Sequence, residues 1–90
     1  MNKDREYILE IYCGTMPPFS KTLPLTHDND NKAIGQAHKM LKEVMKEKEL
    51  SYALLQCRYG SNFYDVACLI NIEGNLATYY HLQYIQRTKP

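Results

Sequence analysis

The segment from Ser51 to Gln86 reads SYALLQCRYGSNFYDVACLINIEGNLATYYHLQYIQ. It is rich in β-branched and aromatic residues, which favour strands. Two glycine-containing pairs interrupt it, Gly60-Ser61 and Gly74-Asn75, and a Gly-X pair suits the two-residue type II′ turn that joins antiparallel strands. The segment therefore predicts a three-stranded meander, with strands at Ser51–Tyr59, Phe63–Ile72 and Leu76–Gln86.

These two turns also predict the register of the meander. In the first hairpin Cys57 faces Tyr64, Leu55 faces Val66 and Ala53 faces Cys68, and in the second Ile70 faces Tyr79 and Cys68 faces His81. Because side chains alternate along a strand, each residue then has a defined face. One face carries Ala53, Leu55, Cys57, Tyr64, Val66, Cys68, Ile70, Ile72, Ala77, Tyr79, His81 and Ile85.

A helix is predicted upstream of the meander, from about residue 29 to residue 48. Apolar residues recur there at spacings of three and four, as on one side of an amphipathic helix. Thr26 or Asp28 is the expected N-cap, and Asp30 lies where the helix dipole favours an anion. We expect the helix to pack on the sheet through Ile34, Ala37, Leu41 and Val44.

Two shorter strands are predicted before the helix. Tyr7–Cys13 has strand composition and is ended by Gly14 and the following prolines. A second run, Lys21–Thr26, can return beside it only at the edge of the sheet, because Pro24 has no N–H to donate.

Together these elements predict an α+β fold in the order β-(β)-α-β-β-β. It is a two-layer sandwich in which one amphipathic helix packs on an antiparallel sheet of four or five strands. Ninety residues fit one core, so residues 1–90 are expected to form one domain, with a frayed tail at 87–90.

Composition and charge exclude several classes of protein. Apolar residues make up 44% of the chain and charged residues 23%, which is ordinary globular usage. The net charge of +1 supplies no strong field for duplex nucleic acid. The charged N-terminus has no apolar segment after it, and the longest apolar run, Val66–Ile70, is too short to span a bilayer. We expect a cytoplasmic protein that does not bind membranes.

The reactive residue types give no catalytic or metal site. Cys13, Cys57 and Cys68 are odd in number and lack CxxC spacing, so reduced, structural thiols are expected. Cys68 beside His81 could act as nucleophile and base, but core packing is the preferred interpretation. Residues 27–31, HDNDN, resemble the start of a calcium loop, yet Lys32 and Lys39 occupy ligand positions. We therefore predict no catalytic residue, no metal ligand and no cofactor.

The sheet face opposite the helix is the predicted working surface, because a single helix covers only one side of a sheet. Eight tyrosines and no tryptophan are present, and several of the tyrosines fall on this face with apolar residues and one arginine. Aromatic residues and Arg are enriched at protein interfaces. The predicted partner-binding residues are Tyr12, Tyr52, Leu54, Arg58, Phe63, Leu69, Tyr80, Leu82 and Tyr84.

Two functions fit this surface. The preferred one is a non-enzymatic protein-interaction module that binds another protein or itself as a homodimer. Small adaptor, regulator and inhibitor proteins of bacteria and their phages have a similar build. The alternative is a single-stranded nucleic-acid-binding domain, in which Tyr12, Tyr52, Tyr80 and Tyr84 stack on bases while Arg58 and Arg87 contact phosphates.

Overall fold

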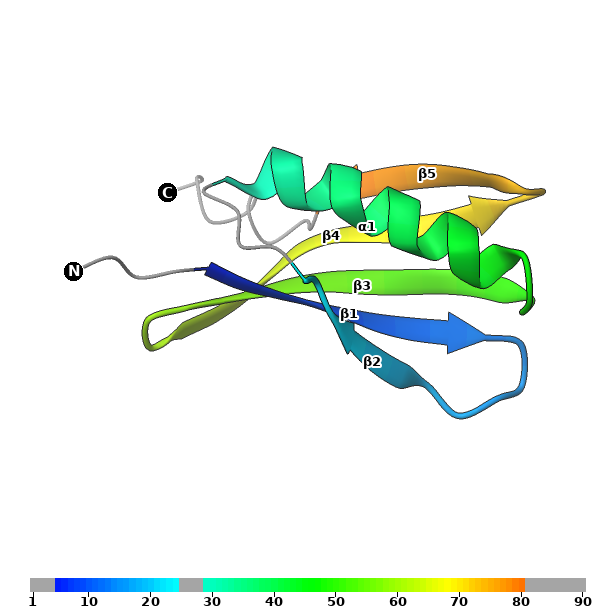
Figure 1. The fold of residues 1–90 in the computed structure, drawn as a ribbon, viewed down its shortest axis with the longest axis horizontal. Helices are drawn as coiled ribbons and strands as arrows, with labels where there is room; N and C mark the ends of the chain where they lie inside the picture. The colour runs from blue at the N-terminus through cyan, green and yellow to red at the C-terminus, as the bar shows by residue number, and fades with distance from the viewer. Residues whose placement is uncertain (1–4, 25–28, 81–90) are drawn as a thin grey trace, which may run out of the picture.

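The computed structural model describes residues 5–24 and 29–80. Within these ranges the chain forms one helix on a five-stranded antiparallel sheet (Figure 1), which confirms the predicted α+β fold. The elements are β1 (Arg5–Cys13), β2 (Phe19–Thr22), α1 (Asp30–Met45), β3 (Leu50–Tyr59), β4 (Asn62–Ile72) and β5 (Asn75–Tyr80).

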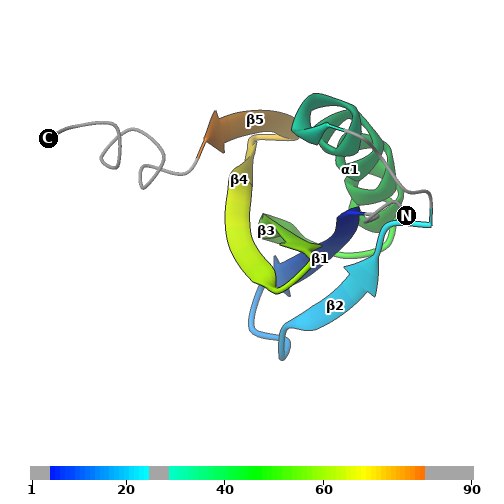
Figure 2. The ribbon, with the colours of Figure 1, turned by 90° about the vertical axis from the view of Figure 1, so that its left-hand side faces the viewer.

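The strand order is β2-β1-β3-β4-β5. β1 therefore lies between β2 and β3. After β2 the chain forms α1, and it then returns as β3 along the edge of β1 that β2 does not occupy. The sheet curves, and α1 packs against its concave side (Figure 2). Among residues 5–24 and 29–80, no second layer covers the convex side, which we call the open face.

The N-terminal hairpin matches the prediction in type and differs in its bounds. β1 starts at Arg5, two residues before the predicted start. β2 is an edge strand, as predicted, although Pro24 is not part of it. It comprises Phe19–Thr22 and not Lys21–Thr26, so Pro24 lies after the strand. Residues 25 and 26 of the predicted strand lie outside the described residues.

The helix begins at its N-cap Asn29, whose side-chain oxygen accepts a hydrogen bond from the Lys32 amide at 2.9 Å. The predicted N-cap, Thr26 or Asp28, is therefore wrong: Asn has the same capping ability, and here Asn29 is the cap. The helix ends at Met45, three residues before the predicted end, with Lys46 as C-cap.

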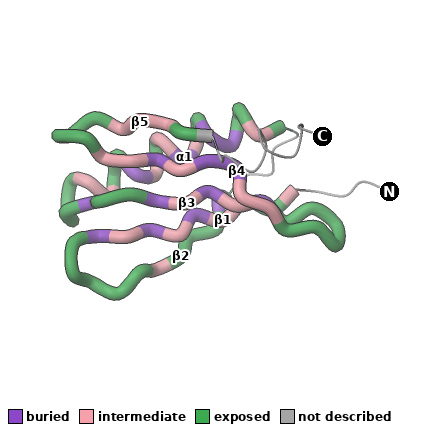
Figure 3. Tube along the Cα trace, turned by 180° about the vertical axis from the view of Figure 1, so that it is seen from behind, coloured by how far each residue is buried: buried purple, intermediate pink, exposed green. Residues whose placement is uncertain are grey.

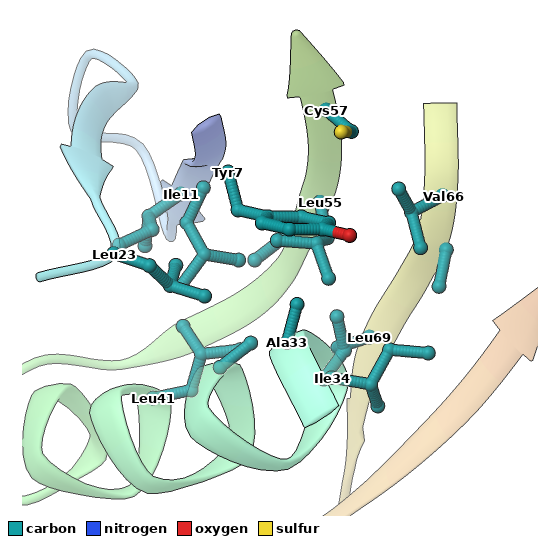
Figure 4. Packing of buried hydrophobic residues seen from close by; sticks show 14 of the residues in the cluster. Tyr7, Ile11, Leu23, Ala33, Ile34, Leu41, Leu55, Cys57, Val66 and Leu69 are labelled. Carbon is teal, nitrogen blue, oxygen red and sulfur yellow. The ribbon is translucent and has the colours of Figure 1, made fainter. Parts of the chain in front are cut away.

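The core lies between the helix and the concave side of the sheet (Figure 4). Leu41 and Ala37 are fully buried and Ile34 nearly so, whereas Val44 is partly buried at the margin. The predicted apolar side of the helix is therefore confirmed. The strands contribute Tyr7, Leu9, Ile11, Cys13, Leu50, Ala53, Leu55, Cys57, Val66, Ala67 and Leu69 to this core.

Asp30 fastens the first turn of α1 to two strands. Its Oδ1 accepts hydrogen bonds from the Tyr7 hydroxyl of β1 at 2.6 Å and from the Tyr64 hydroxyl of β4 at 3.3 Å. The Arg5 guanidinium lies 3.6 Å from the same oxygen. Hydrogen bonds to a charged acceptor are stronger than neutral ones, so this contact sets where the helix begins over the sheet.

The groups around Asp30 hold their protons tightly. Burial, followed by the hydrogen bond to Asp30, raises the pKa of Tyr7 far above its usual value. Burial is also the main cause of the raised pKa of Tyr64, and it raises the pKa of the Cys57 thiol beside them. All three side chains are therefore neutral at physiological pH.

The first hairpin turn is the predicted one, and the second is not. β3 and β4 are joined by Gly60-Ser61, where Gly60 has φ of 64°. β4 and β5 are joined by Glu73-Gly74, with φ of 53° and 91°, so the predicted turn at Gly74-Asn75 is wrong. Positive φ at both central residues defines a type I′ turn, whose twist matches that of the strands. The Asn71 side chain supports it by accepting from the Gly74 amide at 2.8 Å.

A β-bulge in β4 changes the predicted faces. Gln56 pairs with Asp65, but Leu55 pairs with Ala67, which leaves Val66 as an extra residue opposite Leu55. Val66 and Ala67 are both buried. A bulge of this kind shifts the register by one residue, so every later side chain of the strand changes face.

The bulge corrects the predicted position of Leu69. Sequence alternation places Leu69 on the open face, but it is fully buried in the core on the helix side (Figure 4). The predicted pairs Leu55 with Val66 and Ala53 with Cys68 are wrong, whereas Cys57 with Tyr64, before the bulge, is confirmed.

In β5, Thr78 likewise lies on the helix side, where its hydroxyl is hydrogen-bonded to His38 Nε2 at 2.7 Å. His38 thereby joins α1 to β5.

Replacement of Leu41 by alanine should lower the free energy of unfolding by about 2–5 kcal/mol, because it removes a buried side chain and leaves a cavity. The exposed neighbour provides the control: Lys42→Ala should change stability by less than about 0.5 kcal/mol. Urea unfolding followed by circular dichroism measures both values. Equal effects of the two substitutions would contradict the assigned packing face of α1.

The free energy of unfolding should fall as the pH rises above about 9. Unfolded cysteine and tyrosine release protons near pH values of about 8.5 and 10, whereas the fold keeps Cys57, Tyr7 and Tyr64 protonated to higher pH. The folded state then binds more protons than the unfolded state, so the stabilisation is complete below these values and is lost above them. Urea unfolding at a series of pH values measures the decline. Tyr64→Phe should make it shallower, and a flat profile in the unsubstituted protein would contradict the arrangement.

Candidate functional site

The open face is built from rows of side chains that run across neighbouring strands. The strand pairings define one row of Tyr12, Tyr52, Ile70 and Ala77 and a second row of Glu10, Leu54, Cys68 and Tyr79. Seen from the side opposite Figure 1, partly buried positions alternate with buried ones along β1 and β3 (Figure 3). The partly buried positions belong to the open face.

Six uncharged residues in and beside these two rows form an apolar surface, which we call the open-face patch. Tyr79 is 52% exposed, Ile72 48% and Tyr52 37%, although all are large and apolar. The Tyr12 and Tyr52 rings are stacked, with centroids 4.5 Å apart and an interplanar angle of 12°. The patch comprises Tyr12, Tyr52, Leu54, Ile70, Ile72 and Tyr79.

The other end of the open face is polar. The Gln56 amide donates to Asp65 Oδ1 at 3.0 Å. Farther along, the Arg58 guanidinium is 3.3 Å from the Glu6 carboxylate, next to the 55% exposed ring of Phe63. Arg58 and Phe63 therefore share the open face with the patch, but the row containing Gln56 and Asp65 separates them from it.

The predicted binding residues are only partly brought together. Tyr12, Tyr52 and Leu54 lie in the patch, and Arg58 and Phe63 lie at the polar end. Leu69 is buried beneath α1 and leaves the candidate surface. The backbone of Tyr80 pairs with Ala67 at the end of β5. Leu82 and Tyr84 lie outside the described residues.

Sequence reasoning missed Ile70, Ile72 and Tyr79. It assigned them to the helix side because it assumed uninterrupted alternation through β4. The continuous apolar run Val66–Ile70 is the signal that strict alternation fails, since a bulge can turn two consecutive residues inward. The sequence does not show at which residue of this run the bulge occurs.

The polar groups on the open face are poorly suited to nucleophilic chemistry. Burial raises the pKa of the Cys68 thiol, which keeps it in the less reactive thiol form. Desolvation and the nearby Glu10 carboxylate raise the pKa of Tyr12. Cys68 pairs with Tyr79 across β4 and β5, so its predicted pairing with His81 is wrong. His81 itself lies outside the described residues.

Within residues 5–24 and 29–80, no group of three or more His, Cys, Asp or Glu side chains is placed to hold a metal ion. The helix is neither long enough nor apolar enough to cross a membrane.

Comparison of the chain with protein-family models, curated proteins and solved structures finds no match in any of the three.

In the folded protein, Cys68 should be the first cysteine to react with iodoacetamide. It lies partly exposed on the open face, whereas Cys13 and Cys57 are 1% and 0% exposed. All three thiols should be alkylated after unfolding, and mass spectrometry of digested samples gives the rate at each position. Cys68→Ser should abolish the early labelling and Cys57→Ser should not. Equal rates at Cys57 and Cys68 would contradict the bulged register.

Proposed function

We propose that the protein is a non-enzymatic protein-interaction module, an adaptor, regulator or inhibitor, whose open-face patch is covered by a second copy of the chain. The single observation that carries this proposal is the patch itself. Large apolar side chains fill adjacent rows of a sheet face that no described element covers.

The composition of the patch supports a protein partner. None of its six residues is charged, and depletion of charge together with enrichment of tyrosine is typical of the centre of an interface. The paired Tyr12 and Tyr52 rings present a rigid surface with little side-chain entropy to lose. Glu10 lies at the edge of the patch, and Arg58 lies beyond it at the polar end of the open face.

A second copy is the simplest occupant. Closed two-fold dimers are the commonest soluble assemblies, and they bring the same patch of both subunits together. Two such patches bury tyrosine, leucine and isoleucine against one another without forcing a charge into the centre. Face-to-face packing of two sheets is also a common way to form an apolar core.

The alternative role, binding of single-stranded nucleic acid, uses the same face and is less well supported. Arg58 is already engaged by Glu6 at 3.3 Å. The patch supplies no cation for phosphates, and Glu10 beside it repels them. A near-neutral chain also lacks the electrostatic attraction on which such binding depends.

A charge placed in the patch should abolish association. Tyr79→Glu puts an unpaired carboxylate where the partner excludes water, and this is strongly unfavourable. We expect light scattering to show a dimer for the unsubstituted protein and a folded monomer for the variant. Lys42→Glu is the control, since Lys42 is exposed on α1, on the other side of the sheet from the patch. It should remain dimeric.

Two further measurements separate the possible outcomes. Alkylation of Cys68 should slow as protein concentration rises, because the second copy covers it. A single-stranded oligonucleotide added to the sample should leave the dimer unchanged. A concentration-independent monomer, or a monomer shifted by the oligonucleotide in a Tyr79-dependent manner, would contradict the dimer proposal.

A further inference from the structure

The outer edge of β2 presents backbone groups that face no described strand. β2 is the last strand in the order β2-β1-β3-β4-β5 (Figures 1 and 2). The Leu23 amide donates to the Tyr7 carbonyl at 2.9 Å, which marks Tyr7 and Leu23 as a hydrogen-bonded pair. Such pairs alternate along an antiparallel ladder. The N–H and C=O groups of Ser20 and Thr22 therefore point away from β1, toward the free edge.

A pocket of about 370 Å³ lies beside this edge, between β2 and the C-terminal half of α1. Its size is at the lower end of the range for ligand pockets. Phe19, Met40 and Val44 give it a partly buried apolar surface. Phe19 and Lys21 pair with the core residues Ile11 and Leu9, so they lie on the helix side of β2. Alternate side chains of a strand added next to β2 would lie over the pocket.

The charge of the edge strand favours an acidic residue in the partner. The pocket lining itself is balanced, with Lys21 and Lys48 against Glu43 and Glu47. Lys21 is the one charged residue of β2, so its charge is the one that an added strand meets directly. Because opposite charges that face each other across strands are stabilising, an acidic residue opposite Lys21 completes the match.

The same lysine disfavours a second copy at this edge. If two copies of β2 paired antiparallel, Ser20 of each copy would lie opposite Thr22 of the other. This arrangement uses all the outward backbone groups of Ser20 and Thr22, and it places Lys21 directly opposite Lys21 of the other copy. Like charges in that position are destabilising. A lysine on an edge strand is a common protection against such self-association. The occupant is therefore a chain of different sequence.

We propose that the free edge of β2 binds an extended acidic segment of another protein by strand addition, with one large apolar side chain in the pocket beside α1. The added strand hydrogen-bonds to Ser20 and Thr22. An antiparallel segment has its acidic residue opposite Lys21 and, two residues later, its apolar residue opposite Phe19. This surface is separate from the open-face patch.

Fluorescence anisotropy with a labelled peptide, Thr-Glu-Val-Leu-Val-Thr, tests the proposal. Thr22→Pro removes an outward N–H that β1 does not use, so the sheet should keep its fold, as circular dichroism will show. We expect it to weaken peptide binding by at least about tenfold. Tyr79→Glu should leave peptide binding unchanged, which separates this site from the dimer proposal.

A charge exchange provides the second, independent variant. Lys21→Glu should weaken binding of the acidic peptide and strengthen binding of Thr-Lys-Val-Leu-Val-Thr, because the cross-strand pair is restored with its signs reversed. Lys42→Glu, on the exposed surface of α1 and outside the pocket lining, should change neither affinity. Three results would overturn the proposal: no binding of either peptide at about 1 mM, wild-type affinity in Thr22→Pro, or conversion of a dimer into a monomer by Thr22→Pro.

Discussion

The β-bulge at Val66 controls what each face of the sheet carries. One extra residue in β4 lets Val66 and Ala67 both point into the core opposite Leu55. Beyond it, Leu69 enters the core, and Ile70 joins Tyr52 on the other face. Without the bulge, β4 would present the opposite set of side chains to the helix. The core and the open-face patch are therefore two consequences of the same local distortion.

The helix can cover only the concave side of the sheet, and its position there is fastened at one end by Asp30. The Tyr7 and Tyr64 hydroxyls reach this carboxylate from strands on either side of β3. Farther along the helix, His38 is hydrogen-bonded to Thr78 of β5. Polar contacts thus set the direction of the helix, while Leu41 and Ala37 supply the apolar contact beneath it. Since this one helix packs on the concave side, no element among residues 5–24 and 29–80 covers the convex side.

The two proposed binding surfaces differ in the kind of partner that they favour. The open-face patch is broad and uncharged, and its recognition depends on apolar and aromatic contact. The edge of β2 offers backbone hydrogen bonds, a small pocket and the charge of Lys21, and its recognition depends on an extended chain. Lys21 opposes self-pairing at the edge, which is consistent with the proposal that a second copy binds the patch. The two proposed surfaces are separate, so the two proposed partners would not compete.

Local sequence features determined the elements and the fold class. The spacing of Ile34, Ala37 and Leu41 predicted the helix and its buried side, and Gly60-Ser61 predicted the first hairpin and the pairing of Cys57 with Tyr64. Pro24 predicted an edge strand, although β2 itself lies upstream of it. The helix and first-hairpin predictions succeed because turn formation and amphipathic periodicity act between residues close together in the chain. The same reasoning placed Tyr12, Tyr52 and Leu54 on the open face.

Only the tertiary structure decided the register beyond Val66, the turn at Glu73-Gly74 and the position of β1 between β2 and β3. Each is settled by contacts between distant segments. Val66 and Ala67 are both buried in the core, and the apolar run that contains them does not show which residue is the extra one. The choice of Glu73-Gly74 over Gly74-Asn75 similarly depends on the twist of the whole hairpin. A one-residue change in strand pairing moves every later side chain to the opposite face, so Leu69 belongs to the core and Ile70 to the patch for a reason that only the packed sheet supplies.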